Sequence, residues 1–175
     1  MAVWRADGES FGYDLVQNGF VAMFHSREIL DETIAGFRRD GYRIVLLDSA
    51  TWEHRSELHA AFASALGFPG HYGRNLDALN DCLRDVAERD LGWSGDETGL
   101  VIVIDHFDRF NDAASSTALA VLEAVADAAR RGALLGNRIL CLIRADDPFL
   151  ELGRIGGAEP LWNPREWVIA DRTGA

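Results

Sequence analysis

Two continuous apolar runs constrain the fold of this chain more than any other feature of its sequence. The first covers residues 100–104, and the second follows Arg138 and ends at Ile143. A strand that is apolar at every position has both faces covered, as strands in parallel sheets do. Segments with helical spacing separate the strands, and this alternation indicates right-handed crossovers between parallel strands. We therefore predict an α/β fold with a small, mostly parallel sheet and flanking helices.

Further elements are expected on both sides of these runs. The expected strands cover residues 19–25 and 42–47, and the expected helices cover residues 27–40, 56–66, 75–89 and 113–131. Gly41 is expected to end the first of these helices. We divide the chain into an N-terminal strand–helix addition packed on the main domain (1–42), a main domain (43–144) and a C-terminal turn-rich tail (145–175), in which Trp162 and Trp167 could pack back on the body.

Composition and charge restrict the classes of function. The formal net charge is -11 and the sequence pI is about 4.8. A nucleic-acid binder needs clustered Lys and Arg to neutralise phosphates, so this balance argues against direct nucleic-acid binding. It suits a basic partner, although acidity also serves solubility alone. No apolar stretch has the length of a membrane span, and the N-terminus lacks the pattern of a signal peptide, so we expect a cytoplasmic protein.

The two cysteines, Cys82 and Cys141, do not form a disulfide framework, and their spacing resembles no zinc site. Cys82 falls within a predicted helix and Cys141 within an apolar strand. We expect both to be buried thiols that pack as small hydrophobic groups.

The helix expected at residues 75–89 carries two contrasting faces. Apolar residues at spacings of three and four form one stripe, which consists of Leu76, Leu79, Leu83 and Val86. Acidic residues form a second row, which consists of Asp77, Asp81, Asp85 and Glu88. Like charges one turn apart destabilise a helix by about 0.2–0.5 kcal/mol per pair, so this row favours a role in interaction. A purely structural interpretation remains open, because Asp77 lies in the first turn and Arg74 and Arg84 could pair with neighbouring acids.

The segment that leads into this helix and continues along it has a long, ordered motif. Residues 71–83 read HYGRNLDALNDCL, residues 56–59 read SELH, and residues 66–69 read LGFP. Together they resemble the barstar family of intracellular ribonuclease inhibitors, whose hallmark is a Tyr-Gly turn followed by Asn-Leu-Asp-Ala-Leu and then Asp-Cys-Leu. Residues 100–105 resemble the central strand of that family and residues 138–143 its final strand. The resemblance covers residues 43–144.

The resemblance implies a function, a partner and a set of contact residues. Members of the family inhibit a basic ribonuclease by inserting the helix after the Tyr-Gly turn into its active site. The resemblance therefore implies that this chain is an immunity-type inhibitor of a secreted or toxin-type ribonuclease, with no catalytic residue, metal or other cofactor. Asp77 and Asp81 would be the key carboxylates, and Asp81 would mimic a substrate phosphate. The other implied contact residues are His71, Tyr72, Gly73, Asn75, Asn80 and, by counting back from Gly132, Asp127.

This sequence departs from the family pattern at aromatic positions. The family typically has an aromatic residue where His71 stands and a Trp where Asn80 stands, and a further Trp corresponds to Val86. Aromatic anchors often carry interface energy, so these departures indicate a different target or a weaker complex. The physical logic of inhibition holds without them. A ribonuclease carries cations that stabilise phosphate charge, and carboxylates spaced about 6 Å apart on a helix can occupy those sites.

Two alternatives remain open from the residues. Asp48, Asp105 and the pair Asp146-Asp147 each follow an apolar strand, where carboxylates could hold Mg²⁺ for phosphohydrolase chemistry. Acids also commonly end strands in turns, and no phosphate-binding loop accompanies them. His106 beside Asp105 could be catalytic, but no nucleophile motif appears, and His59 is expected to pack or bond locally at a helix surface. The second alternative is a barstar-like interaction module whose target is not a ribonuclease.

Overall fold

The strands form one five-stranded, fully parallel sheet. The computed structural model describes residues 19–52 and 54–174, so the expectations for the first 18 residues lie outside the described chain. The strands are β1 (Val21–Phe24), β2 (Arg43–Asp48), β3 (Leu100–Asp105), β4 (Ile139–Arg144) and β5 (Leu161–Trp162). Their spatial order is β2-β3-β4-β1-β5, and every pair is parallel. The predicted α/β class with a parallel sheet is therefore confirmed.

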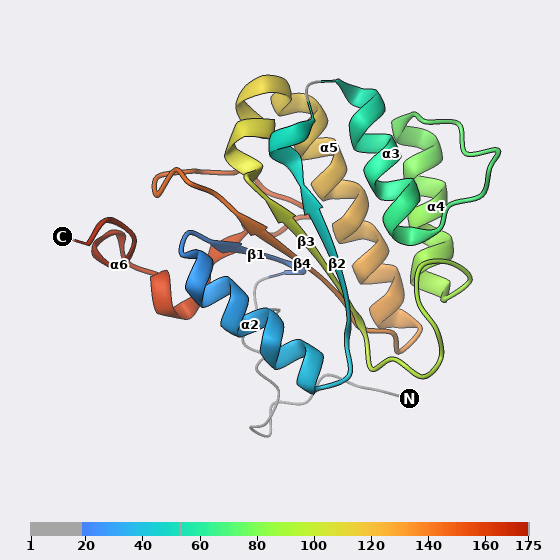
Figure 1. The fold of residues 1–175 in the computed structure, drawn as a ribbon, viewed down its shortest axis with the longest axis horizontal. Helices are drawn as coiled ribbons and strands as arrows, with labels where there is room; N and C mark the ends of the chain where they lie inside the picture. The colour runs from blue at the N-terminus through green and yellow to red at the C-terminus, as the bar shows by residue number, and fades with distance from the viewer. Residues whose placement is uncertain (1–18, 53, 175) are drawn as a thin grey trace.

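Three helices cover one face of the sheet and one helix covers the other (Figure 1). The first face packs against α3 (Arg55–Leu66), α4 (Leu76–Glu88) and α5 (Phe107–Leu134). The opposite face packs against α2 (Arg27–Arg39). Because β1 and β2 are separated by two strands, α2 must cross beneath β3 and β4 to connect them. All six residues of β3 and all six of β4 are buried, as their uninterrupted apolar runs predict.

The first helix of the described chain shows how the local sequence sets its ends. The hydroxyl oxygen of Ser26 accepts a hydrogen bond from the backbone N–H of Ile29 and so caps the N-terminus of α2. The helix ends at Arg39, and Gly41 then adopts a φ of +81°, which glycine adopts without strain. Its buried residues are Leu30, Thr33, Ile34 and Phe37.

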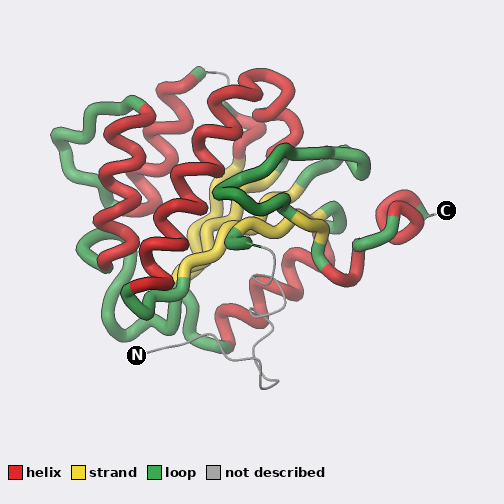
Figure 2. The backbone as a smooth tube through the Cα atoms, turned by 180° about the vertical axis from the view of Figure 1, so that it is seen from behind, coloured by secondary structure: helices red, strands yellow, loops and turns green. Residues whose placement is uncertain are grey.

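The structure corrects one expectation about elements and adds to another. The helix expected to begin at about 113 begins at Phe107, and an irregular residue, Ala114 (φ -153°, ψ 58°), divides its first turns from the rest. The tail, expected to be turn-rich, also contains the short strand β5 and two short helices, η2 (Pro164–Glu166) and α6 (Ile169–Thr173). Figure 2 shows how this tail runs past the edge of the sheet.

Both terminal additions contribute to the same sheet as the main domain. β1 from the N-terminal part pairs with β4 of the main domain and with β5 of the tail. Trp162 packs against the core, whereas the expectation for Trp167 is wrong, because its side chain is exposed. None of the described helices is long and apolar enough to cross a membrane. The division of the chain at residues 42 and 145 stays a prediction.

A buried carboxylate joins the two additions. Glu166 accepts hydrogen bonds from the backbone N–H groups of His25, at 3.1 Å, and Ser26, at 2.6 Å, and from the side-chain amide of Asn163. Glu166 is 1% exposed, so these donors replace the water that its carboxylate would otherwise bind. The tail thereby supplies an anion just before the N-terminus of α2, where the helix dipole favours negative charge.

We predict that Glu166→Ala lowers the free energy of unfolding by about 2–3 kcal/mol, because it leaves two partly buried backbone donors and the buried amide of Asn163 without their acceptor. Urea denaturation at pH 7 measures the effect. The matched control is Glu159→Ala, which removes an exposed carboxylate of the same tail. Equal stability of the two variants would contradict the role assigned to Glu166.

Candidate functional site

The loop before α4 is built around Tyr72. Its ring packs edge-on against Phe68, with ring centroids 5.0 Å apart, and against His59, at 5.7 Å. Its hydroxyl oxygen lies 2.5 Å from Nδ1 of His59, at hydrogen-bonding distance. Burial raises the pKa of Tyr72 to about 12, so the hydroxyl stays protonated at neutral pH. His59 was expected at a helix surface; it is instead 2% exposed and fixes the loop from beneath.

The turn from Gly73 to Asn75 joins this loop to α4. A Cβ atom on Gly73 would lie 3.3 Å from Cβ of Ala78, which is closer than most such contacts. Arg74 adopts a left-handed φ of 48°. The side-chain oxygen of Asn75 then accepts a hydrogen bond of 2.8 Å from the backbone N–H of Ala78. Asn75 is therefore the N-cap of α4, and it is also an exposed candidate contact residue beside Gly73.

The two faces of α4 are separated as the spacing predicts. Leu79, Leu83 and Val86 are buried against the sheet and α5, whereas Leu76 is half-buried. The candidate carboxylates Asp77 and Asp81 are exposed on the opposite side. The remaining acids, Asp85 and Glu88, are exposed as well, and Glu88 is paired with Arg131 of α5. The apolar side anchors the helix, and the acidic side faces solvent.

The other predicted contact residues lie in the loop, on α4 itself and on α5. His71 is exposed in the loop, and Asn80 is half-buried on α4. Asp127 is exposed on α5 and accepts a hydrogen bond of 2.5 Å from Arg130. It lies one turn before Arg131, on the side of α5 that reaches the C-terminal end of α4. The structure therefore brings together the residues of the loop and α4, and it places Asp127 nearer the far end of that helix.

Both cysteines are buried, as predicted. Cys82 is 7% exposed on α4, and burial raises the pKa of its thiol, with Asp85 and Asp81 adding to the shift. Cys141 lies fully buried in β4, and burial raises its pKa to about 12. Both thiols are free. A thiol with a raised pKa is a poor nucleophile at neutral pH, so each acts as a packing group.

Comparison with known proteins agrees with this geometry. Residues 42–144 match the family described as Barstar (barnase inhibitor), over more than half of the chain. The chain belongs to the barstar family. A curated relative from Bacillus subtilis (strain 168), named "Putative ribonuclease inhibitor YrdF", is 36% identical over 86 residues, which cover 49% of this chain and 85% of the relative. The barstar match contains the loop, α4 and strands β2 to β4, whereas β1, α2 and the tail lie outside it.

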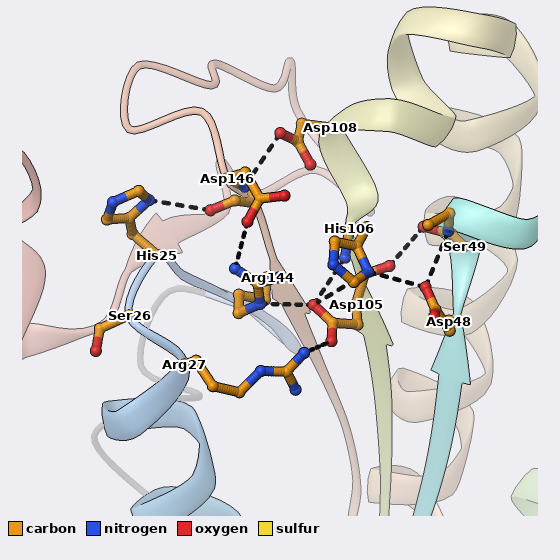
Figure 3. A network of polar contacts seen from close by, with 12 residues as sticks. His25, Ser26, Arg27, Asp48, Ser49, Asp105, His106, Asp108, Arg144 and Asp146 are labelled. Carbon is orange, nitrogen blue, oxygen red and sulfur yellow. Dashed lines mark hydrogen bonds and ion pairs between the residues drawn. The ribbon is translucent and has the colours of Figure 1, made fainter.

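A second polar cluster lies at the carboxyl edge of the sheet, where β3 and β4 of the barstar region meet the N-terminal addition (Figure 3). Arg144, which is 7% exposed, donates from Nε to Asp105 at 2.5 Å and from Nη1 to Asp146 at 2.6 Å. Arg27 of α2 donates to the other oxygen of Asp105. Two arginines thus neutralise a carboxylate that burial would otherwise destabilise.

Asp48, Asp105 and Asp146, the carboxylates of the alternative metal site, each contact a basic side chain of the protein. Nδ1 of His106 lies 2.8 Å from Oδ1 of Asp48. Partial burial opposes ionisation of Asp48, but the hydrogen bonds with His106 and with the backbone N–H of Ala50, together with the charges of His106 and Arg27, outweigh it and lower the pKa of this carboxyl. The hydrogen bond from Arg144 lowers the pKa of Asp146. Among residues 19–52 and 54–174, no three His, Cys, Asp or Glu side chains are grouped to hold a metal ion. The contacts of this edge are those of an ion-pair network that fixes α2 to the sheet.

We predict that acid weakens the fold through His59. Burial lowers the pKa of His59, so the unfolded chain binds a proton more readily than the folded chain does. The contribution to stability is therefore complete above about pH 6.5, the ordinary value, and is lost as the pH falls toward the lowered value. Urea denaturation at pH 7 and pH 5 should show a larger loss of stability for the wild type than for His59→Gln.

The control for this prediction is His71→Gln, which removes an exposed imidazole from the loop before α4 that His59 supports. This variant should keep the wild-type difference between the two pH values. An equal loss for wild type and His59→Gln would show that other groups carry the acid sensitivity.

Proposed function

We propose that this chain inhibits a basic ribonuclease by placing the acidic face of α4 in the active site of the enzyme. The observation that carries the proposal is the exposed pair Asp77 and Asp81, held on a buried, capped helix of a barstar-family chain. A curated relative that is named as a ribonuclease inhibitor supports the same class of function. The chain then acts as a stoichiometric binding protein, with no chemistry of its own.

The geometry suits the electrostatics of such an enzyme. A ribonuclease carries preorganised cations where phosphate charge develops, and a carboxylate can occupy such a position. Asp77 and Asp81 are one helical turn apart, so their side chains project from the same side of α4 at about 6 Å spacing. The buried face of α4 packs on the core, so the carboxylates lose little further freedom on binding. Asp81 is assigned to the phosphate position and Asp77 to a flanking cation.

The loop supplies the remainder of the proposed contact surface. His71, Gly73 and Asn75 are exposed beside the N-terminus of α4, and Tyr72 is half-buried beneath them. Asn80 is half-buried on α4, and Asp127 extends the acidic surface along α5. With histidine and asparagine at positions 71 and 80, the contact is more polar than an aromatic one. The proposed ribonuclease therefore has a polar surface around its phosphate-binding cations.

The biological setting follows from what such a protein protects. A secreted or toxin-type ribonuclease endangers the RNA of the cell that makes it, and an inhibitor in the bacterial cytoplasm removes this danger. We assign the chain to that immunity role. The net charge of -11 assists it, because attraction at long range speeds encounter with a basic enzyme.

We predict that Asp81→Asn weakens the complex by about 2–5 kcal/mol, because it leaves a cation of the ribonuclease buried without its counter-charge. Titration of the chain into RNA-cleavage assays with small basic microbial ribonucleases measures inhibition and stoichiometry. Asp31→Asn removes one charge from an exposed position on α2 and should inhibit like the wild type. Full inhibition by the double variant Asp77→Asn/Asp81→Asn would remove α4 from the mechanism.

We predict that salt affects the association rate constant of the complex more than its dissociation rate constant. As ionic strength rises from about 0.05 M to 0.5 M, the association rate constant should fall by an order of magnitude or more, because attraction between the two surfaces is screened. The dissociation rate constant should change much less, because close charge pairs are screened less. Stopped-flow kinetics measures both, and a dissociation rate that carries most of the salt dependence would contradict this account.

A further inference from the structure

The acidic helix α4 contains one basic residue, Arg84. Its Nη1 lies 3.3 Å from Oδ1 of Asp81, one turn earlier on the same helix. Both side chains are largely exposed, 56% for Arg84 and 73% for Asp81. The guanidinium therefore lies on the surface that the proposed function assigns to the ribonuclease, in contact with the carboxylate that is assigned to the phosphate position.

The other acids of the row differ from Asp81. Glu88 is paired with Arg131 of α5, at the end of the helix. Within the part of the chain that the structure describes, neither Asp77 nor Asp85 forms an ion pair. The one central carboxylate with a cationic partner is thus Asp81, and that partner comes from its own helix.

A cation of the ribonuclease that binds Asp81 must compete with this internal partner. An exposed ion pair contributes about 0.2–1 kcal/mol, which corresponds to a factor of about 1.4 to 5 in affinity. Arg84 also brings a positive charge toward a basic surface, and like charges in contact oppose binding. Competition and repulsion act in the same direction. The repulsion needs only Arg84, whereas the competition also needs the carboxylate of Asp81.

On the basis of the proposed function, we propose that Arg84 is an internal competitor for the cation-binding carboxylate Asp81 and thereby limits the affinity of this chain for basic ribonucleases. The residue is a specificity determinant, because a ribonuclease with a strong cation opposite Asp81 displaces Arg84, whereas a weakly basic one does not. The chain therefore binds most tightly those ribonucleases whose cation displaces Arg84 from Asp81.

The test is to measure the binding of Arg84→Gln to a basic microbial ribonuclease that the wild type inhibits. Arg38→Gln is the matched control, because it removes the same charge from an exposed position on α2, across the sheet from α4. Arg84→Gln should bind about two- to fivefold more tightly than Arg38→Gln. In a chain that already carries Asp81→Asn, the advantage of Arg84→Gln over Arg38→Gln should fall, because the competition needs the carboxylate and only the repulsion remains.

Each other outcome has a distinct meaning. Arg84→Gln that binds as tightly as Arg38→Gln, or more weakly, overturns the competition while leaving the inhibitor function intact. An advantage of Arg84→Gln that keeps its full size with Asp81→Asn also overturns it, because the effect then does not pass through Asp81. If the wild type inhibits none of a panel of basic ribonucleases, the proposed function fails, and the competition fails with it.

Discussion

The requirement to cover both faces of β3 and β4 governs the architecture of this protein. Every residue of these strands is buried, so water must be excluded from both sides of the central sheet. On one face the barstar region provides α3, α4 and α5. On the other face the cover comes from α2, whose Leu30, Ile34 and Phe37 pack with Val101, Val103 and Leu142 of the sheet. The N-terminal addition is therefore part of the core, because without it this apolar surface would face solvent.

The same constraint shapes the proposed binding surface. Since α4 must bury Leu79, Leu83 and Val86 to complete the core, only its outer side is available for a partner, and that side is acidic. The polar cluster around Asp105 acts at a different place, where Arg144 and Arg27 fasten β4 and α2 to the end of β3. The two charged regions thus have different roles. Charges in one region neutralise each other, whereas in the other region Asp77 and Asp85 form no ion pair within the part of the chain that the structure describes.

Local sequence predicts the elements with strong periodicity well. The apolar runs of β3 and β4, the two faces of α4 and the buried state of both cysteines follow from spacing and composition alone, and the family follows from the motif at residues 71–83. Other features depend on distant partners. β5 has only two residues and exists because β1 lies beside it, so no periodic pattern marks it. The first turns of α5 follow a left-handed residue, His106, which sequence spacing does not reveal.

The candidate site likewise has some features that local sequence predicts and others that depend on the fold. The acidic row and the Asn75 cap can be predicted from the sequence, because both depend on neighbours within one helix. The contact between Arg84 and Asp81 was one of several pairings that the spacing allowed. The support of Tyr72 by His59 required the fold, because its geometry depends on how α3 packs against the loop.

The position of β1 has a consequence for how the chain is made. Among the described strands β1 leaves the ribosome first, yet its partner β4 follows it by about 120 residues. Hydrogen bonding to a distant partner must await the synthesis of that partner, and such non-local pairing slows folding. During translation, α2 and β1 emerge before the surface that they cover exists. The final closure of the sheet, including the seam between β1 and β5, therefore takes place only after β5 has been synthesised.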